Sequence, residues 1–359
     1  MAEVGQIKAS PEIQIVFQTL ATTAIQRSAQ GILCIILKDN KTKAKWTTIK
    51  SISDLEAKSW DDKSVKLITL AMQKYAPKKI LVRALQTDET DYATVLKELE
   101  KRKINWLACP NAQSQDDTKV VTWVKQQFGT TAIGKTIKYV SSFASNSDHV
   151  AIVELANTGT YKSKLGDFTA QEYTVAIAGA IAGCPLNRSL DNAIMPDLVE
   201  VVDVDAKLGK FSLYNDDGVV RVNYAVNSKT TFDSSWKKDT RKIKVVEGMC
   251  MVVDDIRDTF KNYWLGIYLN SYDNKMNFCS NVTKVYFKEL APNVLSADYD
   301  NKIEIDFEAQ KRYIVTEGLD PEEMTELEIK KYPTGDDVYL TGDLRFADTM
   351  SNLQLNILM

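Results

Sequence analysis

The sequence predicts an α/β plus α+β protein, in which an N-terminal α/β domain with a mostly parallel sheet precedes a C-terminal α+β domain. Apolar runs alternate with helical patterns from about residue 30 to about residue 160, which is typical of a parallel sheet. After about Leu190 the pattern changes to short alternating strands separated by turns. With 44% hydrophobic and 26% charged residues among 359, the composition is that of a globular chain.

The first half contains the continuous apolar runs that predict buried strands. They are 31–39, 79–85, 104–110 and 149–155, with "TIKYVSSFA" before the last of them and "PEIQIVFQTL" (11–20) as an earlier strand. Between them, "SVKLITLAMQKYA", "DYATVLKELEKRK" and "DDTKVVTWVKQQFG" have helical spacing of apolar residues. A further helix is predicted over 169–185, where the second half is small and apolar.

The second half predicts the strands "DLVEVVDV", "KFSLYND", "VVRVNYAVN" and "KIKVVEGM", then two amphipathic helices over 249–267 and 278–290. The strands "KIEIDFEAQ" and "DVYLTGDLRF" follow. These changes divide the chain into an N-terminal arm (1–20), an α/β domain (21–190), a C-terminal α+β core (191–338) and a C-terminal arm (339–359).

Both arms carry alternating apolar residues. In "LQLNILM" the residues Leu353, Leu355, Ile357 and Met359 are apolar, with Gln354 and Asn356 between them, which predicts a strand with one buried face. The same spacing occurs at Ile13, Ile15 and Phe17. The open question is which sheet the terminal strand joins.

Composition and charge exclude several classes of function. The net charge of −3 gives no reason to expect nucleic acid as the main partner. No window approaches ~18 uninterrupted apolar residues, so we expect no membrane insertion. The five cysteines are scattered and form no CxxC pair, which predicts reduced thiols of a cytoplasmic chain and no metal site.

One motif suggests a nucleotide-binding site. "GTTAIGKT" (129–136) satisfies G-x-x-x-x-G-K-[ST], and "CMVVDD" (250–255) resembles an apolar strand ending in an Asp for magnesium. The context argues against an NTPase, because a phosphate-binding loop follows a strand and opens a helix. Here the loop follows an amphipathic helix and precedes a strand-like segment. A P-loop-like NTPase of a macromolecular assembly stays as the alternative function.

Other candidate sites favour structural roles. Gly179 and Gly183 in "AIAGAIAG" lack the full dinucleotide fingerprint, which favours a helix face thinned for close approach. The single histidine, His149, starts an apolar strand, and no G-x-S-x-G elbow is present. We therefore expect no catalytic residue, no cofactor and no enzyme activity, which points to an assembly protein.

The chain resembles tail sheath proteins of contractile-tailed phages. The resemblance begins in "YTVAIAGAIAGCPLNRSLDNAIMPDLVEVVDV" (173–204), where Asp191 stands in place of the family's usual Thr. It continues in "GVVRVNYAVNSKTTF", in "KIKVVEGMCMVVDDIRDTFKNYWLGIYLN" and in the closing "DVYLTGDLRFADTMSNLQLNILM". It covers roughly 170–359 well and the preceding α/β part more weakly.

The resemblance implies a structural subunit that polymerises as stacked hexameric rings around an inner tube. It implies contraction that drives the tube through a target cell envelope. It also implies exchange of terminal β-strands with a sheet in the neighbour's C-terminal domain, with the seven alternating apolar residues of the two arms as contact residues. The implied partners are other copies, the inner tail tube protein, and the baseplate and tail terminator proteins. The implied location is a phage or bacteriocin-like tail particle assembled in the bacterial cytoplasm. A third hypothesis is that the chain is a tube or baseplate component of the same machine. The added α/β domain disfavours it, because tube subunits are typically smaller single β-domains.

Two further expectations concern contacts and hinges. The segment "DPEEMTELEIKK" (320–331) predicts an acidic helix, which suggests a tube contact held by charge through Glu322, Glu323 and Glu326. The turn-rich segments "ASP" (9–11) and "PTGDDV" (333–338) suggest flexible hinges before the two arms.

Overall fold

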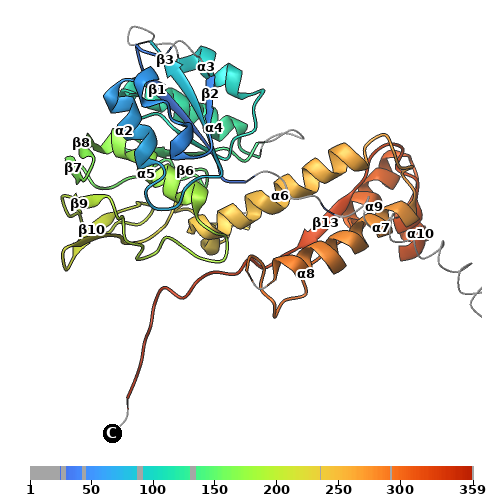
Figure 1. Ribbon diagram of the computed structural model, residues 1–359. Helices are drawn as coiled ribbons and strands as arrows, with labels where there is room; N and C mark the ends of the chain where they lie inside the picture. Colours follow the sequence, from blue (N-terminus) through green and yellow to red (C-terminus); the bar gives the residue numbers. More distant parts are fainter. Residues whose placement is uncertain are drawn as a thin grey trace, which may run out of the picture. The chain divides into compact units, whose positions relative to one another are not determined.

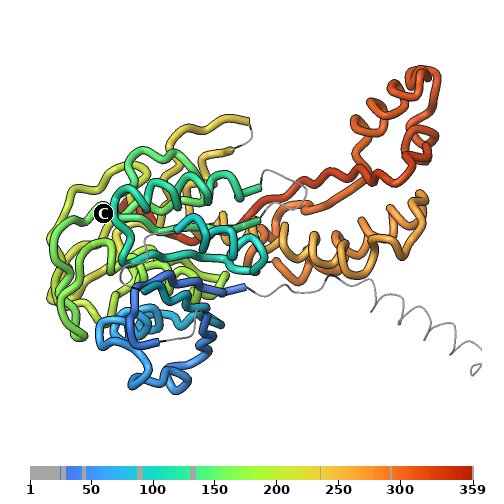
Figure 2. The backbone as a smooth tube through the Cα atoms, turned by 90° about the horizontal axis from the view of Figure 1, so that it is seen from above, coloured from blue at the N-terminus to red at the C-terminus, as the bar shows by residue number. Residues whose placement is uncertain are grey.

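The computed structural model describes residue 25 and residues 30–42, 46–86, 92–129, 135–234, 236–291 and 293–357 (Figures 1 and 2). Contacts divide the described chain into two compact units. The large unit comprises 30–250 and 348–357, and the small unit comprises 251–347. The sequence pattern placed the domain change near Leu190, whereas the compact unit continues to Cys250. Local periodicity does not report the long-range contacts that define a compact unit.

A six-stranded sheet forms the centre of the large unit. Its order is β2-β3-β1-β4-β5-β6, and all neighbours are parallel except β2 with β3. The strands are β1 (Ile32–Lys38), β2 (Trp46–Ile49), β3 (Lys79–Leu85), β4 (Trp106–Ala108), β5 (Lys138–Ser141) and β6 (Ile152–Glu154). The mixed α/β class predicted from the sequence is confirmed.

Helices cover both faces of this sheet. Alternate residues of β1 point to opposite faces of the sheet and enter separate cores. Leu33, Ile35 and Leu37 belong to the first core, and Ile32, Cys34 and Ile36 belong to the second. The first core includes α2 (Asp62–Leu70) and α5 (Ala170–Gly183), and the second includes α3 (Tyr92–Leu99) and α4 (Ser114–Gln127). Figure 1 shows α2 and α3 on opposite sides of the strands.

Two small sheets complete the large unit. One has the order β8-β7-β9, from β7 (Thr160–Ser163), β8 (Gly166–Thr169) and β9 (Leu198–Glu200). The other is the hairpin of β10 (Leu213–Asp216) and β11 (Val219–Val222), which confirms the strands predicted there. The turn residue Asp217 has a φ of 44°, and Gly218 also has a positive φ.

In its described residues the small unit is mainly helical, with one two-stranded sheet. Its helices and turns are the end of α6 (Ile243–Tyr263), α7 (Tyr272–Asn281), the π-helical turn Val282–Tyr286, α8 (Phe287–Leu290), α9 (Phe307–Thr316) and α10 (Glu326–Lys331). Strand β12 (Lys302–Ile305) pairs antiparallel with β13 (Leu340–Asp343). The two strands are the neighbouring orange and red segments of Figure 2.

Three predicted elements of the second half were wrong in type or extent. "KIKVVEGM" is the first part of α6 and not a strand. Its β-branched residues favour strands locally, but Ile243, Val245 and Val246 are buried at the start of a helix, and tertiary packing overrides propensity. "KIEIDFEAQ" is a strand only to Ile305, because Asp306 then caps α9 by accepting from the Ala309 N–H at 2.8 Å. The acidic segment 320–331 is a 3₁₀ turn, Pro321–Glu323, followed by the short α10.

Helix α5 packs unusually close to α2. It begins with a capping box between Thr169 and Glu172 and is buried on all sides from Tyr173 to Ile181. A Cβ atom at Gly179 would collide with the carbonyl oxygen of Ala71, and one at Gly183 with that of Tyr75. The thinned helix face predicted from "AIAGAIAG" is therefore present, and its glycines allow two backbones to touch.

We expect Gly179→Ala to lower the free energy of unfolding by about 1–3 kcal/mol, as overpacked cores do, although alanine favours helices by about 1 kcal/mol over glycine. Urea denaturation followed by circular dichroism measures the change. Ala182→Gly, a partly buried position in the same helix, shows the cost of glycine alone. A Gly179→Ala protein as stable as the wild type would contradict the close approach.

Candidate assembly surfaces

Among the residues that the structure describes, the C-terminal arm has no strand partner. The first part of the predicted arm, β13, belongs to the sheet with β12, so the free arm is the segment 348–357. Its apolar side chains are exposed: 88% for Leu353, 69% for Leu355 and 75% for Ile357. Figure 1 shows this segment in red as an extended trace. The fourth predicted contact residue, Met359, lies outside the described residues, as do Ile13, Ile15 and Phe17 of the N-terminal arm.

The sheet of the small unit has one open edge. On the outer side of β12 the Thr283 hydroxyl accepts from the Ile303 N–H at 3.1 Å and donates to the Ile303 carbonyl at 3.4 Å. Within the described residues, no strand lies on the outer side of β13. An edge of this kind offers free backbone donors and acceptors to an added strand.

The predicted hinge 333–338 is a turn that hydrogen bonds hold to Asn270. The Asn270 side-chain amide donates to the Thr334 hydroxyl at 3.2 Å and to the carbonyls of Gly335 and Asp337 at 2.9 and 2.8 Å. The Asp337 N–H donates to the Thr334 carbonyl at 3.0 Å. The other predicted hinge, 9–11, lies outside the described residues.

Two of the three proposed tube-contact residues form ion pairs within the small unit. Glu322 accepts from Lys311 at 2.8 Å, and Glu326 pairs with Lys330 four residues later. Both carboxylates are largely exposed. Exposed pairs contribute about 0–1 kcal/mol each, so these charges stay accessible to another protein.

The described residues of the nucleotide-like motif do not have the setting of a phosphate-binding loop. Residues 130–134 lie outside the described chain, and the flanking residues stand between α4 and β5, so no helix begins after them. The Lys135 ammonium donates to the carbonyls of Leu99 at 2.9 Å, Arg102 at 3.3 Å and Glu100, at the C-terminal end of α3. This lysine caps a helix, where a cation is stabilised by the free carbonyls.

The two aspartates predicted to bind magnesium instead contact other side chains. Asp254 and Asp255 lie within α6 and not at the end of a strand. Asp254 pairs with Arg257, and Asp255 accepts from the Tyr286 hydroxyl at 2.7 Å. The described residues hold no cluster of three or more His, Cys, Asp or Glu side chains that could bind a metal ion. No described helix is long and apolar enough to cross a membrane.

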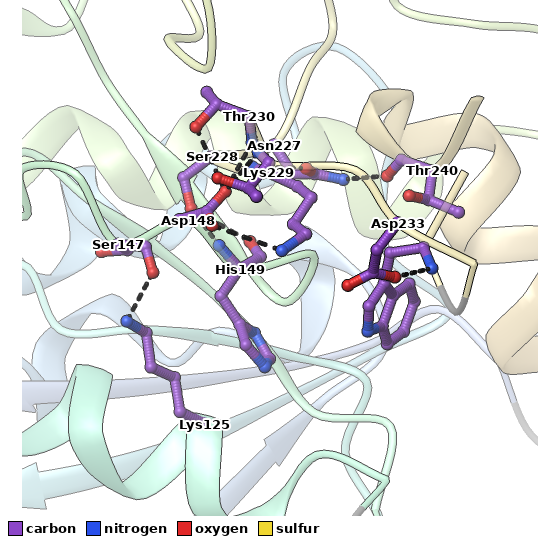
Figure 3. Close-up of polar contacts among 12 residues, drawn as sticks. Lys125, Ser147, Asp148, His149, Asn227, Ser228, Lys229, Thr230, Asp233 and Thr240 are labelled. Carbon is purple, nitrogen blue, oxygen red and sulfur yellow. Dashed lines mark hydrogen bonds and ion pairs between the residues drawn. The ribbon is translucent and has the colours of Figure 1, made fainter. Parts of the chain in front are cut away.

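The contacts of His149 are those of a residue that supports the fold and not of a catalytic base (Figure 3). Its Nδ1 accepts from the Ala151 N–H at 3.1 Å, and its ring meets Phe128 edge-on at 5.6 Å between centroids. The Ser228 hydroxyl bonds the backbone of His149 and not its ring. Burial, with the charges of Lys125 and Lys229 nearby, lowers the pKa of His149 to about 4. The ring is therefore neutral near pH 7.

The neighbouring Asp148 holds the segment "SKTT" (228–231) in place. Its carboxylate accepts from the N–H groups of Thr230 and Thr231 at 2.6 and 2.9 Å and pairs with Lys229 at 3.3 Å (Figure 3). Hydrogen bonds from the Thr230 N–H, the Thr231 N–H and the Lys229 side chain lower the pKa of Asp148 below its usual range. This part of the resembled motif "GVVRVNYAVNSKTTF" therefore has a structural role.

A polar cluster that the sequence did not reveal lies at the root of the arm. Asp191 pairs with Lys242 at 2.8 Å, and the Ser351 hydroxyl donates to the same Asp191 oxygen at 2.6 Å. The two charged side chains are only 11% and 6% exposed. Asp191 is the position at which the chain departs from the resembled motif. No sequence signal joins three polar residues this far apart.

The comparisons with known proteins point to one family. No protein-family model matches the chain. The chain is 28% identical to the tail sheath protein of Clostridium phage phiCD119, over 97% of this chain and 98% of that protein. The chain is related to tail sheath proteins. This confirms the resemblance inferred from the sequence, and the relative's name indicates no catalytic function.

Solved structures share the fold of this sheath-related chain. The sheath tail protein from Desulfitobacterium hafniense matches with a TM-score of 0.63 at 16% identity, over 78% of this chain and 91% of that chain. A chain of the anti-feeding prophage baseplate matches with a TM-score of 0.66 at 13% identity, over 94% of this chain and 95% of that chain. The fold shared with this baseplate chain therefore extends over nearly the whole sequence.

We expect His149 to make stability pH-dependent. An unfolded histidine has a pKa near 6.5 and the folded ring about 4, so the unfolded state binds the proton more tightly. The free energy of unfolding falls as the pH drops from about 6.5 towards 4, by about 3 kcal/mol from this group. His149→Asn keeps an acceptor for the Ala151 N–H and removes the titration. Urea denaturation between pH 4.5 and 7 should give a flatter pH profile for this variant, and parallel profiles would contradict the assignment.

Proposed function

We propose that the chain is the structural subunit of a contractile tail sheath, which polymerises as stacked hexameric rings around an inner tube. The observation that carries this proposal is the alignment with a tail sheath protein over nearly the full length of both chains. The anti-feeding prophage baseplate that shares the fold is six-fold symmetrised, which favours rings of six. A second structure of that baseplate is in a contracted state, which favours a contractile role.

We infer that the copies are linked by exchanged terminal strands. The arm has three exposed apolar side chains without partners among the described residues, and β13 has an open edge. A strand added to that edge supplies backbone hydrogen bonds, while alternate side chains enter apolar pockets. The donor and the acceptor then belong to neighbouring copies, and the open edge is covered in the assembly.

The energy of one exchanged arm is small. Five hydrogen bonds contribute about 1 kcal/mol each, and burial of Leu353, Leu355 and Ile357 contributes roughly 2 kcal/mol each. Ordering the five residues 353–357 costs about 1–2 kcal/mol per residue. The net gain of a few kcal/mol gives weak pairing of two free copies. In a ring the later contacts form at high effective concentration, so assembly on a template becomes favourable.

The partners follow from this role. They are other copies of the chain, the inner tail tube protein, and the baseplate and tail terminator proteins, in a phage or phage-like tail particle assembled in the bacterial cytoplasm. The sheath contracts on the tube and drives it through the target cell envelope. Tube contact through Glu322, Glu323 and Glu326 uses charges that remain exposed in the small unit.

Deleting 353–359 should leave a folded, monomeric protein that forms no sheath, because the deleted residues join a neighbour's sheet and not their own. Circular dichroism and sedimentation check folding, and negative-stain electron microscopy checks for hollow, striated tubes. The matched control is the full-length chain with Gln354→Ala and Asn356→Ala, which keeps the apolar residues. Unfolding of the truncated chain would show that the strand completes its own domain.

Reversing Glu322, Glu323 and Glu326 to Lys should abolish co-sedimentation of sheath with purified tubes while leaving the fold intact. The control reverses three exposed acidic residues of the same unit, Asp300, Glu308 and Glu317, with the same change in net charge. If both triple variants assemble equally well on tubes, the proposed tube contact is wrong.

A further inference from the structure

The arm is fixed at its root and free beyond it. The Ser351 hydroxyl lies between the two members of the Asp191–Lys242 pair, 2.6 Å from the Asp191 carboxylate and 3.3 Å from the Lys242 ammonium. The next residue, Asn352, donates from its side-chain amide to the Tyr224 hydroxyl at 3.1 Å. In the described chain, no hydrogen bond or ion pair joins 353–357 to any other residue. The boundary between held and free arm is thus at Asn352.

The holding site is built into the large unit. Asp191 follows α5, Lys242 directly precedes α6, and the other Asp191 oxygen accepts from the Ala225 N–H at 2.7 Å. The Lys242 ammonium also lies over the Tyr224 ring, 3.9 Å from its centroid. Four chain segments of the large unit meet here. Because buried charges need further hydrogen bonds, the hydroxyl of Ser351 completes a site that already contains both charges.

We propose that Asp191, Lys242 and Tyr224 form an anchor for the root of the C-terminal arm, and that Ser351 and Asn352 are the residues it holds. This inference rests on the proposed function, because the anchor sets how far the exchanged arm can reach. With the root held, the five residues 353–357 span about 17 Å when extended. With the root released, the ten residues from 348 to 357 span about 35 Å.

The anchor therefore fixes the spacing at which neighbouring copies exchange arms. Effective concentration falls roughly as the −3/2 power of tether length, so doubling the free arm lowers it about threefold per arm. A released arm also permits several spacings between copies where the anchored arm permits one. The anchor thus acts as a positioning device for assembly, separate from the apolar residues that make the contact.

The first test measures the root in the unassembled full-length chain. A spin label is placed at residue 353 by Leu353→Cys in a Cys184→Ser background, since the other four cysteines are buried. We expect restricted motion with the native root and a several-fold shorter correlation time after Ser351→Ala and Asn352→Ala. These substitutions leave the Asp191–Lys242 pair intact, so the fold is kept. Gln354→Ala is the control, and equal mobility in all three proteins would overturn the anchor.

The second test measures assembly of the unlabelled chain. Ser351→Ala with Asn352→Ala should raise the concentration needed for sheath formation at least threefold and broaden the ring spacing seen by electron microscopy. Unchanged concentration and spacing, with a mobile root, would overturn the positioning role. If the wild type forms no sheath at all, the proposed function fails, while the label still reports whether the root is held.

Discussion

The close contact of α5 with α2 is the constraint on which the large unit depends. Gly179 and Gly183 let the backbone of α5 reach the carbonyls of Ala71 and Tyr75, so the helix lies deep in the unit. From there it contacts strands of the six-stranded sheet and of the sheet of β7 and β8. The chain then continues from the end of α5 to Asp191. A side chain at either glycine would displace the helix, and with it the turn that carries the arm anchor.

The elements that the sequence predicted well are those whose burial is uniform. The apolar runs of β1 and β3 are covered on both faces, and α5 is small and apolar where it is buried. The nucleotide site was rejected because of the order of predicted helices and strands around the motif. The position of the Lys135 ammonium at the end of α3 agrees with that rejection. The start of α6 was mistaken for a strand because its β-branched residues carry the local signal, while their packing decides the outcome.

The C-terminal arm stays a prediction as a contact segment, and its anchor was not predicted. Alternation of Leu353, Leu355 and Ile357 is visible in the sequence, and their exposure in the single chain agrees with a role in contacts between copies. Asp191, Lys242 and Ser351 are ordinary polar residues far apart in the chain, and only the fold brings them together. Likewise, the division at Cys250 depends on contacts that no periodicity records.

The position of the anchor determines where a pulling force enters the molecule. The chain reaches the arm from β13 of the small unit, yet Ser351 is held by residues of the large unit. Tension applied beyond Asn352 is transmitted first to the Asp191–Lys242 pair and the core behind it. The short pairing of β12 with β13, which would otherwise be unzipped from its end, carries little of the load. In an assembly with exchanged arms, as proposed above, a neighbour that pulls on the arm would load the buried Asp191–Lys242 pair before the strands of the small unit.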